Sequence, residues 1–170
     1  MEEVYSRLRR CGTVLVMHEI SILLHNIRSA HNVGSIFRTA DAAGVRRMYL
    51  SGYTPTPLDQ FKRPQKEIAK TALGAECSVP WEYVKSPAGL IAKLKKEGVA
   101  IVGVEQDDRA LDYRSFTPTN TTLVLLGNEV RGLSKGLRDR CDTLIEISMH
   151  GVKESLNVSV AAGIVLFALK

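Results

Sequence analysis

The sequence predicts an α/β fold in which a mostly parallel, six-stranded sheet is flanked by helices. Apolar runs rich in β-formers alternate with helical patterns from one end of the chain to the other, which is typical of this class. The chain has 170 residues and is 45% hydrophobic, enough for one well-buried core and too few for two comfortable ones. Because no repeat or low-complexity linker divides it, we expect a single domain over residues 1–170, with 1–19 as an N-terminal extension.

Strands and helices are predicted in turn along the chain. Six runs have the length and composition of strands, and they span 20–27, 47–51, 77–83, 99–104, 122–126 and 143–147. Helical patterns span 2–10, 33–43, 65–73, 87–96, 135–140 and 158–169. Several strands lead directly into polar or glycine-containing loops. Open α/β sheets bind ligands at these carboxyl ends, so we expect the site there.

The helix predicted over 33–43 follows the helical period. Its apolar residues recur at the spacing of one buried stripe: Val33, Ile36, Phe37, Ala40 and Ala43. Asn32 has the chemistry of its N-cap. Arg38 lies off the stripe, and Gly34, one turn earlier, leaves room for a ligand or a backbone to approach. A solvated Arg38 paired with Asp41 explains the segment equally well, so the segment alone leaves both interpretations open.

The helix predicted over 158–169 is apolar nearly all round, which indicates burial on most sides. Asn157 is its predicted N-cap, and Ser155 lies just before it. The polar N-terminal end of such a helix must be satisfied by caps, by neighbouring loops or by a ligand. Its apolar run of roughly 12 residues is shorter than the ~20 that a membrane span needs, so no membrane association is expected.

Charge and cysteine content narrow the function classes. Lysine and arginine total 23 against 18 acidic residues, and the resulting net charge of +5 is compatible with a polyanionic partner. Cys11, Cys77 and Cys141 are far apart and form no C-x-x-C pair. This pattern indicates neither a disulfide framework nor a zinc site, and it fits a reducing, cytoplasmic location. We expect no metal.

Residues 127–134 follow a predicted strand and come close to the phosphate-binding pattern G-x-x-x-x-G-K-[ST]. The lysine position is held by Leu133, however, and Lys135 comes two residues late, which disfavours a nucleoside triphosphate site. The chain also lacks the G-x-G-x-x-G pattern of dinucleotide-binding folds. A plain tight turn explains Gly127 but not the Asn-Glu pair that follows it.

Taken in order, three segments resemble the motifs of the SpoU (TrmH-like) branch of the SPOUT RNA methyltransferases. They span 26–40, 125–134 and 145–162. The resemblance covers the chain from about residue 20 to its end, so no separate RNA-binding domain is expected. One departure is Ser148, which stands where the family commonly has proline, and we expect a less rigid loop there.

The resemblance implies transfer of a methyl group from S-adenosylmethionine to a ribose 2'-hydroxyl of structured RNA, with tRNA favoured over rRNA. It also implies a deep trefoil knot near the C-terminus, which is an exception to the rule that connections do not thread loops, and a homodimer. By position, the residues that hold the cofactor are Gly127, Ile147, Leu156 and Val104.

The resemblance further implies that catalysis centres on Arg38, facing the cofactor of the other subunit. The assisting positions are Asn32, Glu129, Ser155 and Asn157. A guanidinium with a pKa above about 12 is a poor proton acceptor, so we expect Arg38 to clamp the target phosphate and the developing alkoxide. The alternative is a knotted RNA-binding or assembly protein without turnover.

Overall fold

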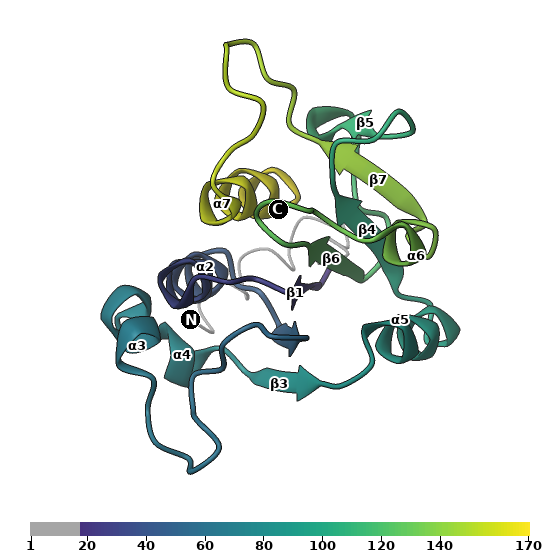
Figure 1. Cartoon of the computed structure of the whole chain (residues 1–170). Helices are drawn as coiled ribbons and strands as arrows, with labels where there is room; N and C mark the ends of the chain where they lie inside the picture. The colour runs from purple at the N-terminus through teal and green to yellow at the C-terminus, as the bar shows by residue number, and fades with distance from the viewer. Residues whose placement is uncertain (1–17) are drawn as a thin grey trace, which may run out of the picture.

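The computed structural model describes residues 18–170, whose strands form one seven-stranded sheet (Figure 1). In chain order the strands are β1 (Ile20–His25), β2 (Arg47–Ser51), β3 (Trp81–Val84), β4 (Ala100–Val104), β5 (Leu111–Asp112), β6 (Thr122–Leu126) and β7 (Thr143–Glu146). Their order across the sheet is β3-β2-β1-β6-β4-β7-β5, and every neighbouring pair is parallel. The predicted α/β class is confirmed, whereas the predicted count of six strands is wrong.

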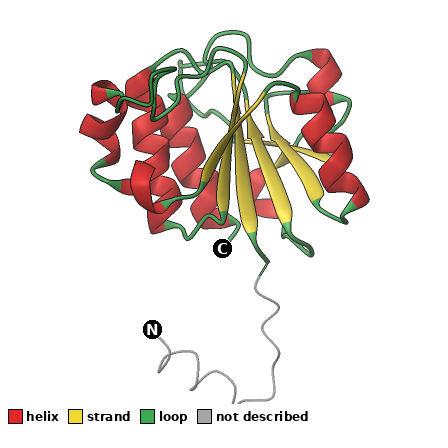
Figure 2. Ribbon diagram, turned by 90° about the horizontal axis from the view of Figure 1, so that it is seen from below, coloured by secondary structure: helices red, strands yellow, loops and turns green. Residues whose placement is uncertain are grey.

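Helices cover both faces of this sheet (Figure 2). They are α2 (Ala30–Ala42), α3 (Lys66–Ala72), α4 (Ala75–Ser78), α5 (Pro87–Lys96), α6 (Lys135–Arg138) and α7 (Val158–Ala168), with a 3₁₀ turn, η2 (Tyr113–Ser115). Helices α2, α3, α4 and α7 pack on one face and α5 and α6 on the other (Figure 1). Within residues 18–170, no helix combines the length and the apolar character that a membrane span requires.

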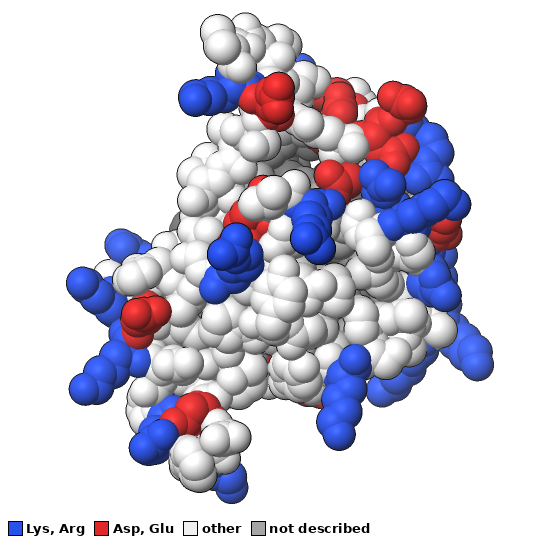
Figure 3. Space-filling model, in the orientation of Figure 1, with Lys and Arg blue, Asp and Glu red and all other residues white. Residues whose placement is uncertain are grey.

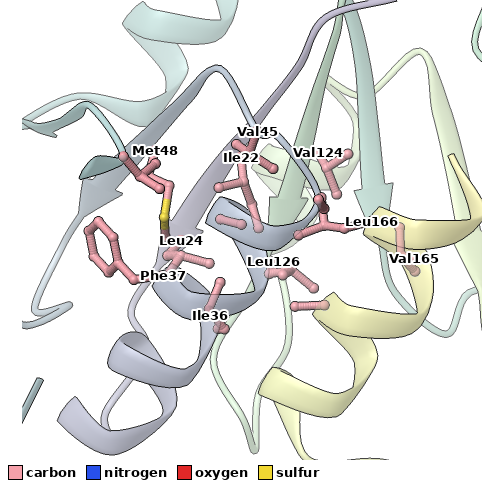
Figure 4. Close-up of a cluster of buried hydrophobic side chains, with 14 of the residues drawn as sticks. Ile22, Leu24, Ile36, Phe37, Val45, Met48, Val124, Leu126, Val165 and Leu166 are labelled. Carbon is pink, nitrogen blue, oxygen red and sulfur yellow. The ribbon is translucent and has the colours of Figure 1, made fainter. Parts of the chain in front are cut away.

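The larger core lies between the sheet and helices α2 and α7. Figure 4 shows Ile22 and Leu24 of β1 directed toward Ile36 and Phe37 of α2, with Leu166 of α7 beside them. All of these side chains are fully buried. Burial of such a side chain contributes about 1.5–3 kcal/mol, so this packing fixes where the first turns of α2 and α7 lie.

The start of α2 differs from the prediction. The helix begins at Ala30, and its N-cap is Ser29, whose Oγ accepts a hydrogen bond from the Asn32 backbone N–H at 3.2 Å. Asn32 is therefore inside the first helical turn, not its cap. Because the cap lies three residues earlier, the side chain of Asn32 is free to reach other loops.

Gly34 has a packing role. A Cβ there would lie 2.1 Å from Thr71 Oγ1 and 2.4 Å from the Ile68 carbonyl oxygen, so only glycine lets α3 pack this closely on α2. The sequence predicted that a ligand or a backbone could approach closely at Gly34. The group that does so is α3 of the same chain. By contrast, the predicted capping of α7 by Asn157 is confirmed, since Asn157 Oδ1 accepts from the Ser159 backbone N–H at 2.8 Å.

Two strand predictions fail locally. The segment predicted as a strand over 77–83 contains the end of α4, and only its last three residues belong to β3. The first strand, predicted to reach residue 27, ends at His25 because Asn26 adopts a positive φ of 60°. Strand β5 was missed because two residues carry no periodic pattern. The helix predicted over 2–10 lies outside the described residues.

Candidate functional site

The site lies at the carboxyl edge of the sheet. Parallel strands end on the same side, so the loops that follow β1, β2, β4, β6 and β7 are neighbours there (Figure 2). Two adjoining hollows open among these loops. Ligands of open α/β sheets bind at this edge, as the sequence predicted.

The first hollow is a cavity of about 300 Å³ at the ends of β4, β6 and β7. All four residues predicted to hold a cofactor line it: Val104, Gly127, Ile147 and Leu156. Further apolar wall comes from Leu126 and Val158. Apolar walls with a few polar groups are typical of sites for small organic ligands.

The charged side chains that line this cavity are all carboxylates. They belong to Glu105, Glu129, Glu146 and Glu154, and none of the lining residues is lysine or arginine. Glu105 is fixed in place, since its carboxylate accepts a hydrogen bond from the Leu133 backbone N–H. An acidic wall attracts a cationic ligand and repels phosphates.

This acidity excludes a nucleoside triphosphate from the cavity. Lys135, the nearest candidate for the phosphate-binding lysine, does not line it, and its ammonium instead pairs with Asp139 at 3.0 Å. Helix α6, which follows the loop, has only four residues. The phosphate-loop interpretation that the sequence already disfavoured is therefore not supported.

Gly127 permits a close crossing of two backbone segments. A Cβ at this position would lie 2.4 Å from the Gly132 carbonyl carbon and 2.5 Å from the Leu133 backbone nitrogen. The loop after β6 folds back on itself here, with Gly132 N–H donating to the Asn128 carbonyl oxygen at 2.9 Å. Glycine is thus required by the path of the chain as well as by the cavity wall.

The second hollow is an open cleft of about 660 Å³ beside the first. Its lining residues are Arg28, Ser29, Asn32, Glu129, Val130, Ser155, Leu156 and Asn157. Four of them also line the first cavity: Glu129, Val130, Ser155 and Leu156. A ligand in the cavity and a ligand in the cleft would therefore meet at these four residues.

Glu129 is held at the N-terminal end of α2. Its carboxylate accepts hydrogen bonds from the backbone N–H groups of Arg28 at 3.1 Å and Ser29 at 3.3 Å, and from Asn32 Nδ2 at 3.2 Å. Partial burial opposes ionisation, but these donors outweigh it and hold the pKa of Glu129 below its ordinary value. Glu129 is consequently an ionised anchor between the loop after β6 and α2.

Asn32 joins this anchor to α7. While its Nδ2 donates to Glu129, its Oδ1 accepts from Asn157 Nδ2 at 3.2 Å. The three predicted motifs thus meet through one chain of side chains. Ser155 lines the same cleft and is exposed. The structure therefore brings together Asn32, Glu129, Ser155 and Asn157, while their catalytic roles stay predictions.

Arg38 stands apart from this group. It is exposed and lines neither hollow. It lies six positions after Asn32 on α2, which places it about 9 Å further along the helix axis. Among residues 18–170 it forms no ion pair, and the predicted partner Asp41 instead accepts a hydrogen bond from Ser78 Oγ at 2.6 Å.

Sequence reasoning missed several residues of the site. Glu105 and Glu146 sit at the ends of β4 and β7, and that position was the available signal. Asn128 is almost fully buried, and its Nδ2 donates to the Asn26 carbonyl oxygen at 3.0 Å and to Tyr53 Oη at 2.9 Å. Its amide therefore ties the loop after β6 to the loops after β1 and β2.

No metal site accompanies these groups in the part of the chain that the structure describes. Across residues 18–170, no three His, Cys, Asp or Glu side chains are grouped so that they could hold a metal ion. Cys77 and Cys141 are both free thiols. Burial raises the pKa of Cys141 to about 11, so it is an unreactive, protonated side chain.

A parallel α/β sheet with an acidic cavity and a polar cleft at its carboxyl edge is typical of open-sheet proteins that bind small molecules there. The family is shown by sequence: residues 19–167 match the model of the SpoU rRNA Methylase family, and the chain belongs to that family. The chain is 35% identical over 145 residues to the 23S rRNA (guanosine-2'-O-)-methyltransferase RlmB of Neisseria meningitidis, covering 85% of this chain and 55% of the relative.

Solved structures agree. The TrmH/SpoU tRNA modifying enzyme of A. aeolicus matches with a TM-score of 0.78 and 29% identity, over 98% of this chain and 81% of that one. AviRb of Streptomyces viridochromogenes, in complex with the cofactor AdoMet, matches with a TM-score of 0.77 and 29% identity, over 88% of this chain and 56% of that one. The chain spans little more than half the length of the curated relatives it matches.

Proposed function

We propose that this chain transfers a methyl group from S-adenosylmethionine to a ribose 2'-hydroxyl of RNA. The observation that carries the proposal is the pair of adjoining hollows, one acidic and one polar, that share Glu129 and Ser155. A methyl donor in the cavity and a ribose in the cleft would meet at that boundary. Such a transfer is an in-line displacement, which depends on alignment more than on a metal.

The cavity fits the proposed cofactor by its chemistry. S-adenosylmethionine carries a positive sulfonium and a positive ammonium beside one carboxylate, so a cavity whose charged side chains are all carboxylates suits it. Apolar side chains such as Ile147 and Leu156 suit the adenine ring. The cavity volume, about 300 Å³, lies within the range of sites for small ligands. When bound, the cofactor supplies an activated methyl group.

The relatives support this assignment. RlmB is named as a guanosine-2'-O-methyltransferase, and AviRb was solved with AdoMet. Both names concern proteins about twice as long as the matched segment, so the activity of this chain is our inference from its own residues.

The chain's own residues would position the ribose. Asn32, Ser155 and Asn157 line the cleft and offer amide and hydroxyl groups to sugar oxygens. Glu129 is a poor candidate for the base, because its carboxylate already accepts several hydrogen bonds and its lowered pKa weakens proton uptake. The proton of the 2'-hydroxyl would therefore leave to solvent or to the RNA phosphate.

Arg38 would complete the site from the partner subunit of a homodimer. It does not line the cleft of its own chain. The next residue, Thr39, packs 3.8 Å from the position of a Cβ on Gly163 of α7. On that side of α7, Val160 and Phe167 leave 49% and 58% of their surfaces exposed. An apolar helix face of this kind is typical of an interface between subunits, so it supports the dimer.

In such a dimer the Arg38 guanidinium would fork onto the target phosphate. Its donors match phosphate geometry, and its charge stabilises the alkoxide that develops at the 2'-oxygen. Mixing subunits provides a test. Arg38→Ala and Asn157→Ala subunits mixed in equal amounts would regain about a quarter of the wild-type sites, whereas a site confined to one chain would regain none.

We also propose the deep trefoil knot for residues 127–170. The path of the chain through the sheet supports the knot. Strand β7 pairs with β4 on the side away from β6, and α7, which follows β7, packs on the face of the sheet that carries α2. The cavity is walled by both of the loops involved, those after β6 and β7. The substrate is proposed to be tRNA in preference to rRNA, as the sequence favoured.

The direct test is transfer of a labelled methyl group to unmodified RNA, followed by mapping of the 2'-O-methyl position. We expect the wild-type protein to methylate only ribose 2'-hydroxyls of this RNA. We expect transfer to fall at least ten-fold in Arg38→Ala and Asn157→Ala, by analogy with single groups that act on the transition state. Arg46→Ala, an exposed arginine paired with Glu19, is the matched control. Calorimetric titration with S-adenosylmethionine distinguishes this enzyme from an inactive RNA-binding protein. We expect binding, and absence of binding would contradict our proposal.

A further inference from the structure

Resting on the proposed action on RNA, we propose that the β2–α3 loop (residues 52–65) is a docking arm that stacks an unpaired RNA base on Phe61 and Arg63. The loop begins at the same carboxyl edge as the two hollows, because it follows the parallel strand β2. Figure 1 shows it projecting at the foot of the view, beyond α3, α4 and β3. It is thus placed to meet a ligand that already occupies the cleft.

The tip of the β2–α3 loop is an ordered turn. Asp59 N–H donates to the Arg63 carbonyl oxygen at 2.9 Å, and Gln65 N–H donates to the Pro57 carbonyl oxygen at 2.8 Å. Asp59 Oδ1 accepts from the backbone N–H groups of Phe61 at 2.8 Å and Arg63 at 2.9 Å. These bonds fix the backbone of the turn so that Phe61 stays exposed. In a flexible loop, the ring would be free to fold against the protein.

Phe61 is exposed over 66% of its surface, although it is an apolar aromatic residue. The Arg63 guanidinium lies over its ring, 4.9 Å from the centroid, and is steadied by Asp59 Oδ2 at 2.7 Å from Nε. The guanidinium covers one face of the ring, so a base would stack on the opposite face of Phe61 or on the outer face of the guanidinium. Unpaired bases stack on such surfaces, because every base has a flat face whatever its sequence.

Three lysines lie close to this pair in the sequence. Lys62, Lys66 and Lys70 are exposed, and within residues 18–170 none of them forms an ion pair. Figure 3 shows blue side chains at the foot of the view, where the loop projects, with red acidic atoms beside them. Unpaired lysines attract phosphates without regard to sequence, so they would complement the stacking of the base.

A second aromatic residue connects the β2–α3 loop to the site. Tyr53 is 57% exposed, yet its hydroxyl is bound to Asn128 Nδ2 at 2.9 Å and its N–H donates to Asn26 Oδ1 at 3.2 Å. Asn128 lines the acidic cavity and precedes Glu129. An RNA strand leaving the cleft would therefore pass Tyr53 before it reaches Phe61.

The arrangement favours RNA loops and bulges over continuous duplexes. Only unpaired bases expose a face to Phe61, whereas paired bases are already stacked in the helix. The loop would thus select structured RNA with an unpaired nucleotide near the methylated ribose. This selection is separate from the chemistry at the cleft, where Phe61 has no contact.

Binding of a hairpin RNA with an open loop tests the proposal, with the same hairpin carrying abasic loop sites as the matched ligand. We expect Phe61→Ala to weaken binding of the intact hairpin roughly 5- to 100-fold and binding of the abasic hairpin little, since only the intact one can stack. Phe61→Tyr keeps a ring and should bind like wild type. Phe61→Leu, apolar but without a ring, should bind like Phe61→Ala.

Fluorescence gives an independent measurement. In Phe61→Trp, the new indole should be quenched when the intact hairpin binds, over the background of Trp81, the one natural tryptophan. Equal affinities of wild type and Phe61→Ala for the intact hairpin would overturn the docking arm, as would an unquenched indole at saturation or absence of hairpin binding. Methyl transfer is scored separately: if wild type transfers no methyl group while Phe61-dependent binding persists, the proposed function fails and the docking arm stands.

Discussion

Asn32 and Asn157 lie 125 positions apart in sequence, and their side-chain amides are joined by a hydrogen bond of 3.2 Å. The bond connects the first turn of α2 to the N-cap of α7, the two helix ends that border the cleft, and so forms one hydrogen-bonded unit. Since the same Asn32 amide also donates to Glu129, the loop after β6 is tied into that unit.

Replacing Asn32 by alanine should loosen all three segments. Asn157 Nδ2 and the Glu129 carboxylate each lose a partner, and a hydrogen bond of this kind contributes about 0.5–1.5 kcal/mol. We expect a loss of about 1–2 kcal/mol in the free energy of unfolding from urea denaturation, together with lower kcat. Asn120→Ala, an exposed asparagine before β6, should change neither quantity. A normal kcat in Asn32→Ala would show that the amide does not align the ribose.

Glu129→Gln should weaken the N-terminal end of α2. The substitution removes a negative charge that accepts from two backbone N–H groups, and such a charge at a helix N-terminus contributes about 0.3–1 kcal/mol. Because the folded pKa of Glu129 lies below its unfolded value of about 4.5, its contribution is present above that pH and is lost as the pH falls through the folded pKa. Denaturation of wild type and variant should converge in acid. Glu97→Gln, an exposed glutamate after α5, serves as the control.

Gly127→Ala should disrupt the cavity through the backbone. The new methyl group would lie 2.4 Å from the Gly132 carbonyl carbon, which is backbone and cannot rotate away. Overpacking of this kind costs about 1–3 kcal/mol, and the loop must move away from the cavity wall. Both the melting temperature and S-adenosylmethionine affinity should fall. At Gly151, a Cβ would meet nothing within 4 Å, so Gly151→Ala should be neutral; equal effects would refute the steric explanation.

His25 should make stability depend on pH. Its Nδ1 lies 2.8 Å from Ser51 Oγ and its Nε2 lies 3.0 Å from Asn26 Nδ2, and burial lowers its pKa below 6.5. As the pH falls below about 6.5, the unfolded chain takes up a proton first, so the free energy of unfolding decreases until the folded pKa is reached. Urea denaturation on both sides of this window should reveal a slope that His25→Gln removes. His150→Gln, at an exposed histidine, should retain it.

Much of the fold could be predicted because local patterns dictate it. The helix over Pro87–Lys96 and the strand over Thr122–Leu126 have the predicted bounds, since periodicity and capping residues mark them without tertiary help. Position 77 shows the limit. Residues around Cys77 have the composition of a strand, but tertiary contacts place them in α4, which packs on the same face of the sheet as α2 and α3.

The residues of the candidate site could be predicted where their types match motifs. Their hydrogen-bond partners and positions could not, because tertiary contacts determine them. Asn32 and Asn157 were singled out as capping residues, yet only Asn157 caps a helix, and their mutual hydrogen bond joins positions that no local pattern relates. The position of Arg38 outside the cleft was likewise beyond local reasoning, because it depends on which turn of α2 the loop after β6 and the start of α7 approach.

The carboxylates of Glu105, Glu129, Glu146 and Glu154 also bear on turnover. Under the proposed reaction, the donor enters as a sulfonium and leaves as an uncharged thioether. The negative carboxylates attract the positively charged sulfur of the sulfonium, but they do not attract the uncharged sulfur of the thioether. Part of the affinity is therefore lost when the methyl group is transferred. The acidic cavity thereby separates fresh cofactor from spent product by charge alone. It favours release and exchange after each cycle.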